Sequence, residues 1–220
     1  MFSGADPHWD LYLPALQETL YMVGLSIFIG TLIGIPLGVL LVITRPGHIF
    51  EQPIIFQIIN TIINIIRSVP FIILLFALIP LTKLIVGTFI GVEGAIVPLV
   101  VYVSPYIARL MESALLEVDA GLIEAFQAMG ATRRQIIFNV MLKEARPAIV
   151  LSLTIAIIGL IDATAMAGII GAGGLGNLAY RYGFQRWETL VMIITVIILI
   201  VLVQLLQTLG NRIARTMRKE

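Results

Sequence analysis

The last 32 residues of this 220-residue chain contain a run, residues 189–210, that is long enough to cross a lipid bilayer and has no charged side chain. A helix that crosses the hydrocarbon core needs about 20 apolar residues. The whole chain is 59% hydrophobic and only 12% charged, whereas a soluble domain is about 45–50% apolar and about 25% charged. Since a bilayer requires each backbone polar group to be bonded within the protein, the sequence predicts an all-α integral membrane protein.

Five such runs predict five membrane-spanning helices in one domain, residues 1–220. The predicted spans are residues 20–43, 54–80, 95–112, 148–170 and 189–210. The second run is interrupted by Arg67-Ser68-Val69-Pro70, which predicts a proline kink within one crossing. In the first run Gly30, Gly34 and Gly38 are spaced by four residues. That spacing is typical of a close helix contact, although glycine is also common in membrane helices in general.

Basic residues predict the orientation, because short cytoplasmic loops are enriched in Lys and Arg. Ten fall on the side of the C-terminus: Arg45, Arg109, Arg133, Arg134, Lys143, Arg146, Arg212, Arg215, Arg218 and Lys219. Three fall on the opposite side: Lys83, Arg181 and Arg186. We therefore expect a cytoplasmic C-terminus and an N-terminus outside. Residues 1–19 contain neither Lys nor Arg, so the first run is predicted to be a permanent span and not a cleaved signal peptide.

The composition also excludes several kinds of site. The chain has no cysteine, which excludes thiolate metal sites and thiol nucleophiles. Its two histidines, His8 and His48, lie outside the apolar runs, so no metal site is expected. The formal net charge of +1 argues against nucleic acid as a partner.

A polar segment, residues 114–147, is predicted to lie on the cytoplasmic face between the third and fourth spans. Asp119 can cap a short helix, and Gly130 lies just beyond its end, where a positive φ is favoured. The apolar residues of this helix recur on one face: Leu122, Phe126 and Met129. Thr132 and Gln135 form a capping-box pattern that begins a second helix.

The segment is therefore predicted to be a helix, a sharp turn and a helix, with apolar side chains exposed. One alternative is an interfacial helix resting on lipid, but such helices usually carry Lys or Arg on their polar face. This helix carries Glu117, Asp119 and Glu124 instead, so a partner protein that accepts a helix in a groove fits better.

The string Glu124-Ala125-Phe126, followed by Gly130 and later by Val140-x-Leu142, resembles the coupling signature of ABC-importer permeases. In that family the short helix docks into a cleft of the ATP-binding subunit, and closure of the ATPase dimer moves the membrane helices. The resemblance assigns ATPase coupling to Leu122, Glu124, Ala125, Phe126, Met129, Gly130, Ala131 and Thr132. Two residues depart from the pattern: Phe126 replaces a small residue, and Lys143 replaces a proline, so the helix break is expected at Pro147.

Further strings resemble the methionine-importer branch of this family, over residues 15–217. They are Thr44–Gly47, Arg67–Leu75, Gly91, Ile107–Arg109 and Gly171–Gly176. The resemblance implies a type I ABC importer permease fold in a bacterial inner membrane. It also implies a homodimer, two ATPase subunits and an extracytoplasmic methionine-binding lipoprotein. This chain would then be no enzyme and need no cofactor, since the partner hydrolyses ATP.

Four residues are predicted to line the substrate path: Arg67, Asp162, Thr164 and Met166. A charge near the centre of a membrane helix costs about 2.5–3.5 kcal/mol on insertion scales, so Arg67 and Asp162 should face protein or water. Arg67 can satisfy carbonyl groups freed by the Pro70 kink or bind a substrate carboxylate. Asp162 can pair with a basic residue across the dimer or line the path. Met166 can contact an apolar substrate side chain or serve ordinary helix packing.

Other functions remain open at this stage. Within the family, the chain could carry another small amino-acid-like or quaternary ammonium solute. A secondary transporter would use Asp162 as a proton or cation site, but it would leave residues 119–145 without a role. An intramembrane enzyme needs a nucleophile paired with a base, and no histidine lies in a predicted span. The glycine-rich string 171–176 lacks the Lys-Ser/Thr ending of a phosphate loop, and we expect it to form a close-packed turn at the dimer interface.

Overall fold

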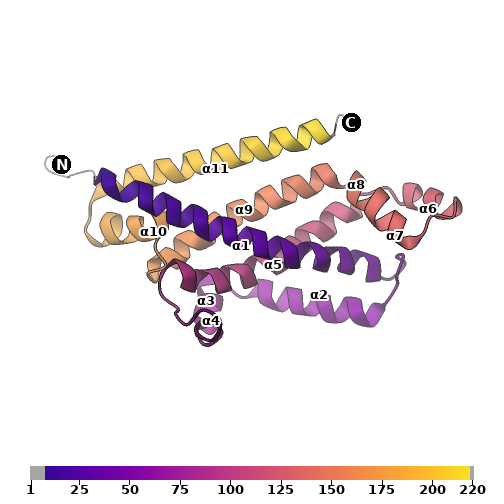
Figure 1. Cartoon of the computed structure of the whole chain (residues 1–220), viewed down its shortest axis with the longest axis horizontal. Coiled ribbons are helices and arrows are strands. Elements are labelled where there is room, and N and C mark those ends of the chain that lie inside the picture. Colours follow the sequence, from indigo (N-terminus) through magenta and orange to yellow (C-terminus); the bar gives the residue numbers. More distant parts are fainter. Residues whose placement is uncertain (1–7, 219–220) are drawn as a thin grey trace. The chain divides into compact units, whose positions relative to one another are not determined.

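The computed structural model describes residues 8–218, which form helices and turns with no β-strand among them (Figure 1). The helical segments are α1 (Trp9–Thr44), α2 (Pro53–Ser68), α3 (Phe71–Ala77), α4 (Ile79–Val86), α5 (Gly91–Leu116), α6 (Ala120–Ala128), α7 (Arg133–Gln135), the π-helical η1 (Ile136–Met141), α8 (Leu142–Glu144), α9 (Arg146–Ile169), α10 (Gly174–Leu178), the π-helical η2 (Ala179–Gln185) and α11 (Thr189–Met217). The prediction of an all-α chain is confirmed.

Four helices, α1, α5, α9 and α11, are long and apolar enough to cross a membrane. Helices α2 and α3 meet the same criterion only as a pair with a sharp break between them. Pro70 causes this break, because it lacks an N–H and disfavours helical backbone at Val69. The predicted single kinked helix is therefore two helices. Pro80 does not end the segment, since it lies in the first turn of α4, where proline is tolerated.

The chain divides into two compact units. Unit 1 contains the described chain up to Gly30, Val69–Val103 and Ile157–Leu206. Unit 2 contains Thr31–Ser68, Ser104–Ala156 and the described chain from Gln207. Helices α1, α5, α9 and α11 each contribute residues to both units, so these four helices and the Ser68–Val69 bond between α2 and α3 are the covalent links between the units.

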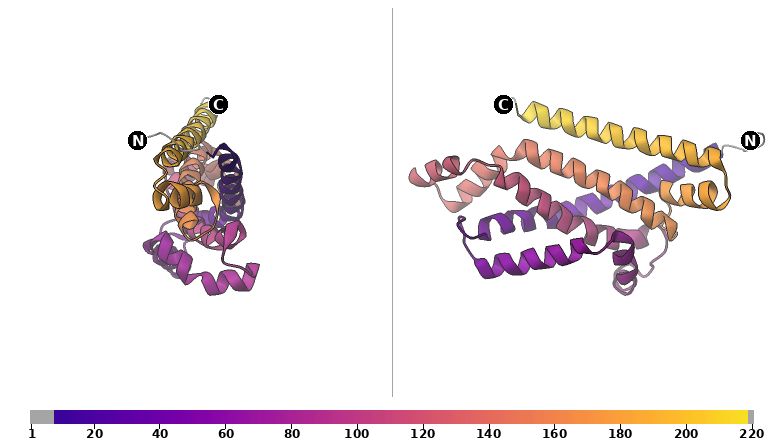
Figure 2. Two further views of the ribbon diagram at one scale, coloured as in Figure 1. Left: turned by 90° about the vertical axis from the view of Figure 1, so that its left-hand side faces the viewer. Right: turned by 180° about the vertical axis from the view of Figure 1, so that it is seen from behind.

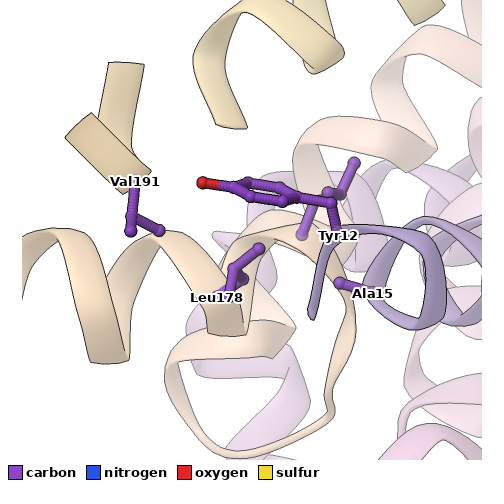
Figure 3. Close-up of a cluster of buried hydrophobic side chains, with 5 residues drawn as sticks. Tyr12, Ala15, Leu178 and Val191 are labelled. Atoms are coloured by element: carbon purple, nitrogen blue, oxygen red, sulfur yellow. The ribbon is translucent and has the colours of Figure 1, made fainter. Parts of the chain in front are cut away.

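The core of unit 1 joins the start of α1 to α10 and α11. Tyr12 and Ala15 of α1 lie against Leu178 and Val191 (Figure 3). Leu175 completes the cluster and is fully buried. This contact fixes the start of α11 beside the start of α1.

The glycine-rich turn before α10 is also packed within unit 1. The Glu18 carboxylate accepts a hydrogen bond from Gly174 N at 2.6 Å, and Thr19 Oγ1 accepts one from Leu175 N at 2.9 Å. A Cβ placed on Gly176 would lie 2.8 Å from the carbonyl carbon of Ala165, closer than real side chains pack. Gly176 is therefore required by a contact within this chain, and the predicted place of this turn at a dimer interface stays a prediction.

In unit 2, the second part of α1 packs closely against α5. A Cβ placed on Gly34 would lie 2.7 Å from Ser104 O, and one on Gly38 would lie 2.7 Å from Ala108 O. Helix α2 runs back alongside this part of α1 (Figure 2), and Leu41, Ile63 and Ala108 form their shared core. The prediction that these glycines allow a close helix contact is confirmed for Gly34 and Gly38.

A charged network joins α1, α2 and α5 in unit 2. The Glu112 side chain is 5% exposed and pairs with Arg109, one helical turn before it, and with Arg45 at 3.8 Å. Arg109 Nη2 also donates to the side-chain oxygens of Asn60 and Asn64 on α2, each at 2.7 Å. A buried carboxylate requires such partners. Arg109, which the orientation prediction counted among the basic residues on the side of the C-terminus, thus joins two helices.

Replacing Gly38 with Ala should destabilise the chain, because the new methyl group would overlap Ala108 and Met111 of α5. Overpacking of this kind costs about 1–3 kcal/mol, so the apparent melting temperature in detergent should fall by roughly 2–12 °C. Gly24→Ala is the matched control on the same helix, since no atom lies within 4 Å of its added Cβ, and its melting temperature should not fall. An equal fall of the melting temperature in both variants would show that the close α1–α5 contact at Gly38 contributes no particular stability.

Candidate functional site

The predicted polar segment between α5 and α9 begins with a capped helix, α6. Asp119 is the N-cap, and its Oδ1 accepts a hydrogen bond from Leu122 N at 3.0 Å. This bond satisfies one of the N–H groups that a helix start leaves unpaired. The predicted capping role of Asp119 is confirmed.

The end of α6 is a Schellman turn centred on Gly130. Ala131 N donates to Phe126 O, and Gly130 N donates to Gln127 O, both at 3.0 Å. Gly130 has a φ of +81°, which glycine adopts without the steric penalty of a side chain. The predicted positive φ of Gly130 is confirmed.

The segment after Gly130 starts with a complete capping box. Gln135 N donates to Thr132 Oγ1 at 3.3 Å, and Thr132 N donates to Gln135 Oε1 at 2.8 Å. The helix then continues through α7, η1 and α8 to Glu144, and α9 begins at Arg146. Pro147 therefore falls in the first turn of α9, where its missing N–H needs no partner.

The outward face of α6 differs from the predicted one. Met129 is 70% exposed, but Leu122 and Phe126 are half-buried. The side chains that α6 exposes are small or polar: Ala120, Glu124, Ala125, Gln127 and Ala128. The prediction of three exposed apolar side chains is thus right only for Met129, because the helix turns Leu122 and Phe126 toward the rest of unit 2.

The loop between α1 and α2 forms the second wall of this site. Its backbone folds back on α1 through hydrogen bonds from Phe50 N to Ile43 O (2.9 Å) and from Gln52 N to Thr44 O (3.0 Å). The guanidinium of Arg133 lies 4.6 Å from the centre of the Phe50 ring, a cation–π contact. The loop thereby holds the turn after Gly130 in place.

A cleft of about 570 Å³ lies between this loop and α6. Its lining residues are Gly47, His48, Ile49, Ala120, Ile123, Glu124, Gln127, Ala131, Arg133 and Ile136. Burial lowers the pKa of the His48 imidazole below its ordinary value, and the Arg45 charge lowers it further. His48 and Phe50 were not predicted as site residues. The only sequence signal for them was an aromatic side chain in a polar loop beside a helix end.

A second candidate site is the exposed face of α9 in unit 1. Asp162 is exposed, and Met166, one turn later, is 46% exposed. Ile169 continues the same face at 48%, since residues three and four apart share one side of a helix. Among the described residues, none forms a salt bridge with Asp162. Because a charge on an apolar helix is costly in lipid, we expect Asp162 to meet water or a partner outside the described chain.

The other two predicted path residues lie elsewhere. Thr164 is 2% exposed, and its hydroxyl donates to Ile161 O at 2.7 Å, so it faces away from Asp162. Arg67 is exposed at the end of α2 in unit 2. Ser68, and not Arg67, bonds a local carbonyl, with its hydroxyl 2.7 Å from Asn64 O. Asp162 and Met166 thus lie on the same exposed face of α9, and Thr164 does not lie on that face.

Similar proteins place this architecture in a family. Residues 30–219 match the family model described as "Binding-protein-dependent transport system inner membrane component". A protein of Vibrio cholerae, described as a probable D-methionine transport system permease protein MetI, is 51% identical over 206 residues, which cover 94% of this chain and 92% of that protein. The D-methionine transport system permease protein MetI of Escherichia coli K12 is 49% identical over 164 residues, covering 74% of this chain and 76% of that protein.

Solved structures agree with these relatives. An inward-facing structure of the MetNI methionine ABC transporter contains a chain that superposes with a TM-score of 0.94 at 48% identity, covering 96% of this chain and 98% of that one. A chain of an amino acid ABC transporter solved with histidines has the same fold, with a TM-score of 0.78 at 22% identity. The chain therefore belongs to the family of inner-membrane components of binding-protein-dependent transport systems.

Proposed function

We propose that this chain is the membrane-spanning subunit of an ATP-driven importer of methionine. The observation that carries the proposal is the near full-length match, in sequence and in fold, to methionine permeases. In this proposal the chain forms a homodimer, two ATPase subunits bind it from the cytoplasm, and an extracytoplasmic lipoprotein delivers methionine. The chain itself catalyses no reaction and needs no cofactor.

The proposed orientation puts the C-terminus in the cytoplasm and the N-terminus outside. It requires five crossings in a single permease domain, with α2 and α3 together forming the second crossing. Charge supports this arrangement, because the described basic residues of the α6–α8 segment and of the α11 end would share the cytoplasmic side.

Coupling to the ATPase is proposed to occur through α6. Its exposed face is narrow, with Ala125 and Ala128 beside Glu124 and Met129, so it can enter a groove on a partner. Both ends of α6 are fixed, by the Asp119 cap and by the Gly130 turn. A force applied to α6 would therefore move the helix as one piece instead of unravelling it.

The movement would pass to α5 and α9, which flank the segment in the chain. Helix α9 begins at Arg146, two residues after α8 ends, and Asp162 lies about 24 Å further along it at 1.5 Å per residue. We propose that Asp162 and Met166 line the substrate path, with the Met166 thioether contacting the substrate side chain. Arg67 remains a proposed path residue, while Thr164 does not, because it is buried.

Uptake in proteoliposomes tests the proposed function. The chain is reconstituted with its ATPase and its binding protein, and labelled methionine uptake should require ATP and survive collapse of the proton gradient. Uptake that follows the proton gradient and ignores ATP would favour a secondary transporter that uses Asp162. ATP-driven transport of a different solute would keep the importer and overturn the methionine assignment.

Gly130→Pro should reduce the rate of ATP-driven methionine uptake by more than tenfold, while the chain still inserts into the membrane and dimerises. Proline cannot adopt a φ of +81° and would remove the Gly130 N–H bond to Gln127 O. Gly87→Pro is a matched control, because Gly87 also ends a helix, has a φ of +83° and donates to Lys83 O. Both variants should lower the melting temperature. Only Gly130→Pro should leave the ATPase subunits hydrolysing ATP without methionine uptake. Equal uptake by the two variants would remove α6 from the coupling role.

Met166→Ala should raise the KM for methionine uptake several-fold, because it removes the proposed thioether contact from an exposed face. The control is Thr164→Val, which keeps the side-chain volume at a buried position two residues away. This control should lower the melting temperature, through the lost hydrogen bond to Ile161 O, and leave the KM unchanged. A KM change in Thr164→Val alone would place the path on the other side of α9.

A further inference from the structure

The cytoplasmic ends of α9 and α11 in unit 2, by the proposed orientation, leave a gap between them. The helices touch at Gly210, where an added Cβ would lie 2.7 Å from Thr154 Cγ2. Beyond this contact, toward the end of α11, the helices enclose a cavity of about 200 Å³. Its lining residues are Pro147, Leu151, Asn211, Ala214, Arg215 and Arg218.

This gap adjoins a larger cleft of about 570 Å³, and the two share Pro147 and Arg218. The cleft adds two basic residues, Lys143 and Arg146, and two acidic ones, Glu117 and Glu144. The two cavities together therefore have four basic side chains against two acidic ones.

The four basic side chains have no acidic partner within the described chain. None of Lys143, Arg146, Arg215 and Arg218 forms a salt bridge with a carboxylate among residues 8–218. Two arginines three residues apart on α11, Arg215 and Arg218, border the same small gap. Planar guanidinium groups that border one gap can both bind the oxygens of one phosphate.

Apolar side chains lie beside the basic ones in the gap. Pro147, Leu151 and Ala214 line its wall. A soluble anion would gain nothing from this apolar wall. A ligand with a phosphate head and a hydrocarbon tail fits both parts, and basic pockets between membrane helices bind such head groups.

We propose that this gap, which we call the α9–α11 site, binds an anionic phospholipid. The phosphate lies between Arg215 and Arg218, Asn211 donates a further hydrogen bond, and the acyl chains run along Pro147 and Leu151 of α9. Lys143 and Arg146 add positive charge at the entrance. The bound lipid fills the space between α9 and α11 at their cytoplasmic ends and so keeps the two ends apart. This position is at the start of α9, the helix that carries Asp162.

Native mass spectrometry of the full-length chain in a neutral detergent tests this site. The probes are phosphatidylglycerol and phosphatidylcholine at equal concentration, with inorganic phosphate as competitor. Phosphatidylglycerol should remain bound in preference to phosphatidylcholine, and millimolar phosphate should not displace it. Arg215→Gln and Arg218→Gln should each lower its occupancy by about fivefold or more, as expected for one basic residue near an anionic head group.

Arg212→Gln is the matched control, because it makes the same charge change on the same helix at a residue that lines neither cavity. Its occupancy should stay within about twofold of the parent. An equal loss of lipid in the control would show that binding depends only on the overall charge of the helix end. Equal retention of phosphatidylcholine would show that the chain binds lipid without regard to the head group. Displacement by phosphate would indicate a free-anion site. If an acidic peptide displaces the lipid while phosphate does not, the surface is a protein contact and the proposal fails.

Discussion

Close contacts between helices, made at glycine, are the interaction on which unit 2 depends. In a bilayer, lipid tails are as apolar as leucine, so helices associate through van der Waals packing and hydrogen bonds. Gly34 and Gly38 bring α1 against α5, and Gly210 brings α11 against α9. In water each of these glycines would weaken its helix by up to about 1 kcal/mol relative to alanine. Here the absent side chain permits the backbone approach that sets where α5 ends and α9 begins.

These contacts have a direct consequence for the segment between α5 and α9. Because α5 is held by α1 and by the Arg109 bridge to α2, its end is a fixed base for α6. The segment is then closed by Asp119 and Gly130, and the Phe50–Arg133 contact joins its turn to the end of α1. A helix whose two ends are fixed in this way has little tendency to unfold locally. In the proposed coupling, motion imposed on α6 would pass into α9, which carries Asp162 and Met166.

The sequence predicted local features well and tertiary ones less well, for physical reasons. Asp119, Gly130 and Thr132 act through backbone groups two or three residues away, so short motifs identify them. The orientation of Phe126 depends on what α6 packs against, and no spacing rule contains that information. Thr164 was predicted to line the substrate path together with Met166, but two residues turn a helix by about 200°, so the two side chains lie on different sides of α9. Glu18 and Phe50 bind partners more than 80 residues away, and nothing near them in the sequence indicates it.

Two carboxylates within the long helices, Glu112 and Asp162, show how the cost of a charge in an apolar helix is met in two different ways. Glu112 is almost fully buried and finds Arg109 and Arg45 inside the chain, so its charge contributes to the packing of α1 and α5. Asp162 is exposed on α9 with no salt bridge to a described residue, although a charge there is expensive in lipid. A chain that satisfies one carboxylate so fully has no structural need for the other. Asp162 on an outward face therefore needs water or a second protein surface along that face, which the proposed path between two copies of the chain would provide.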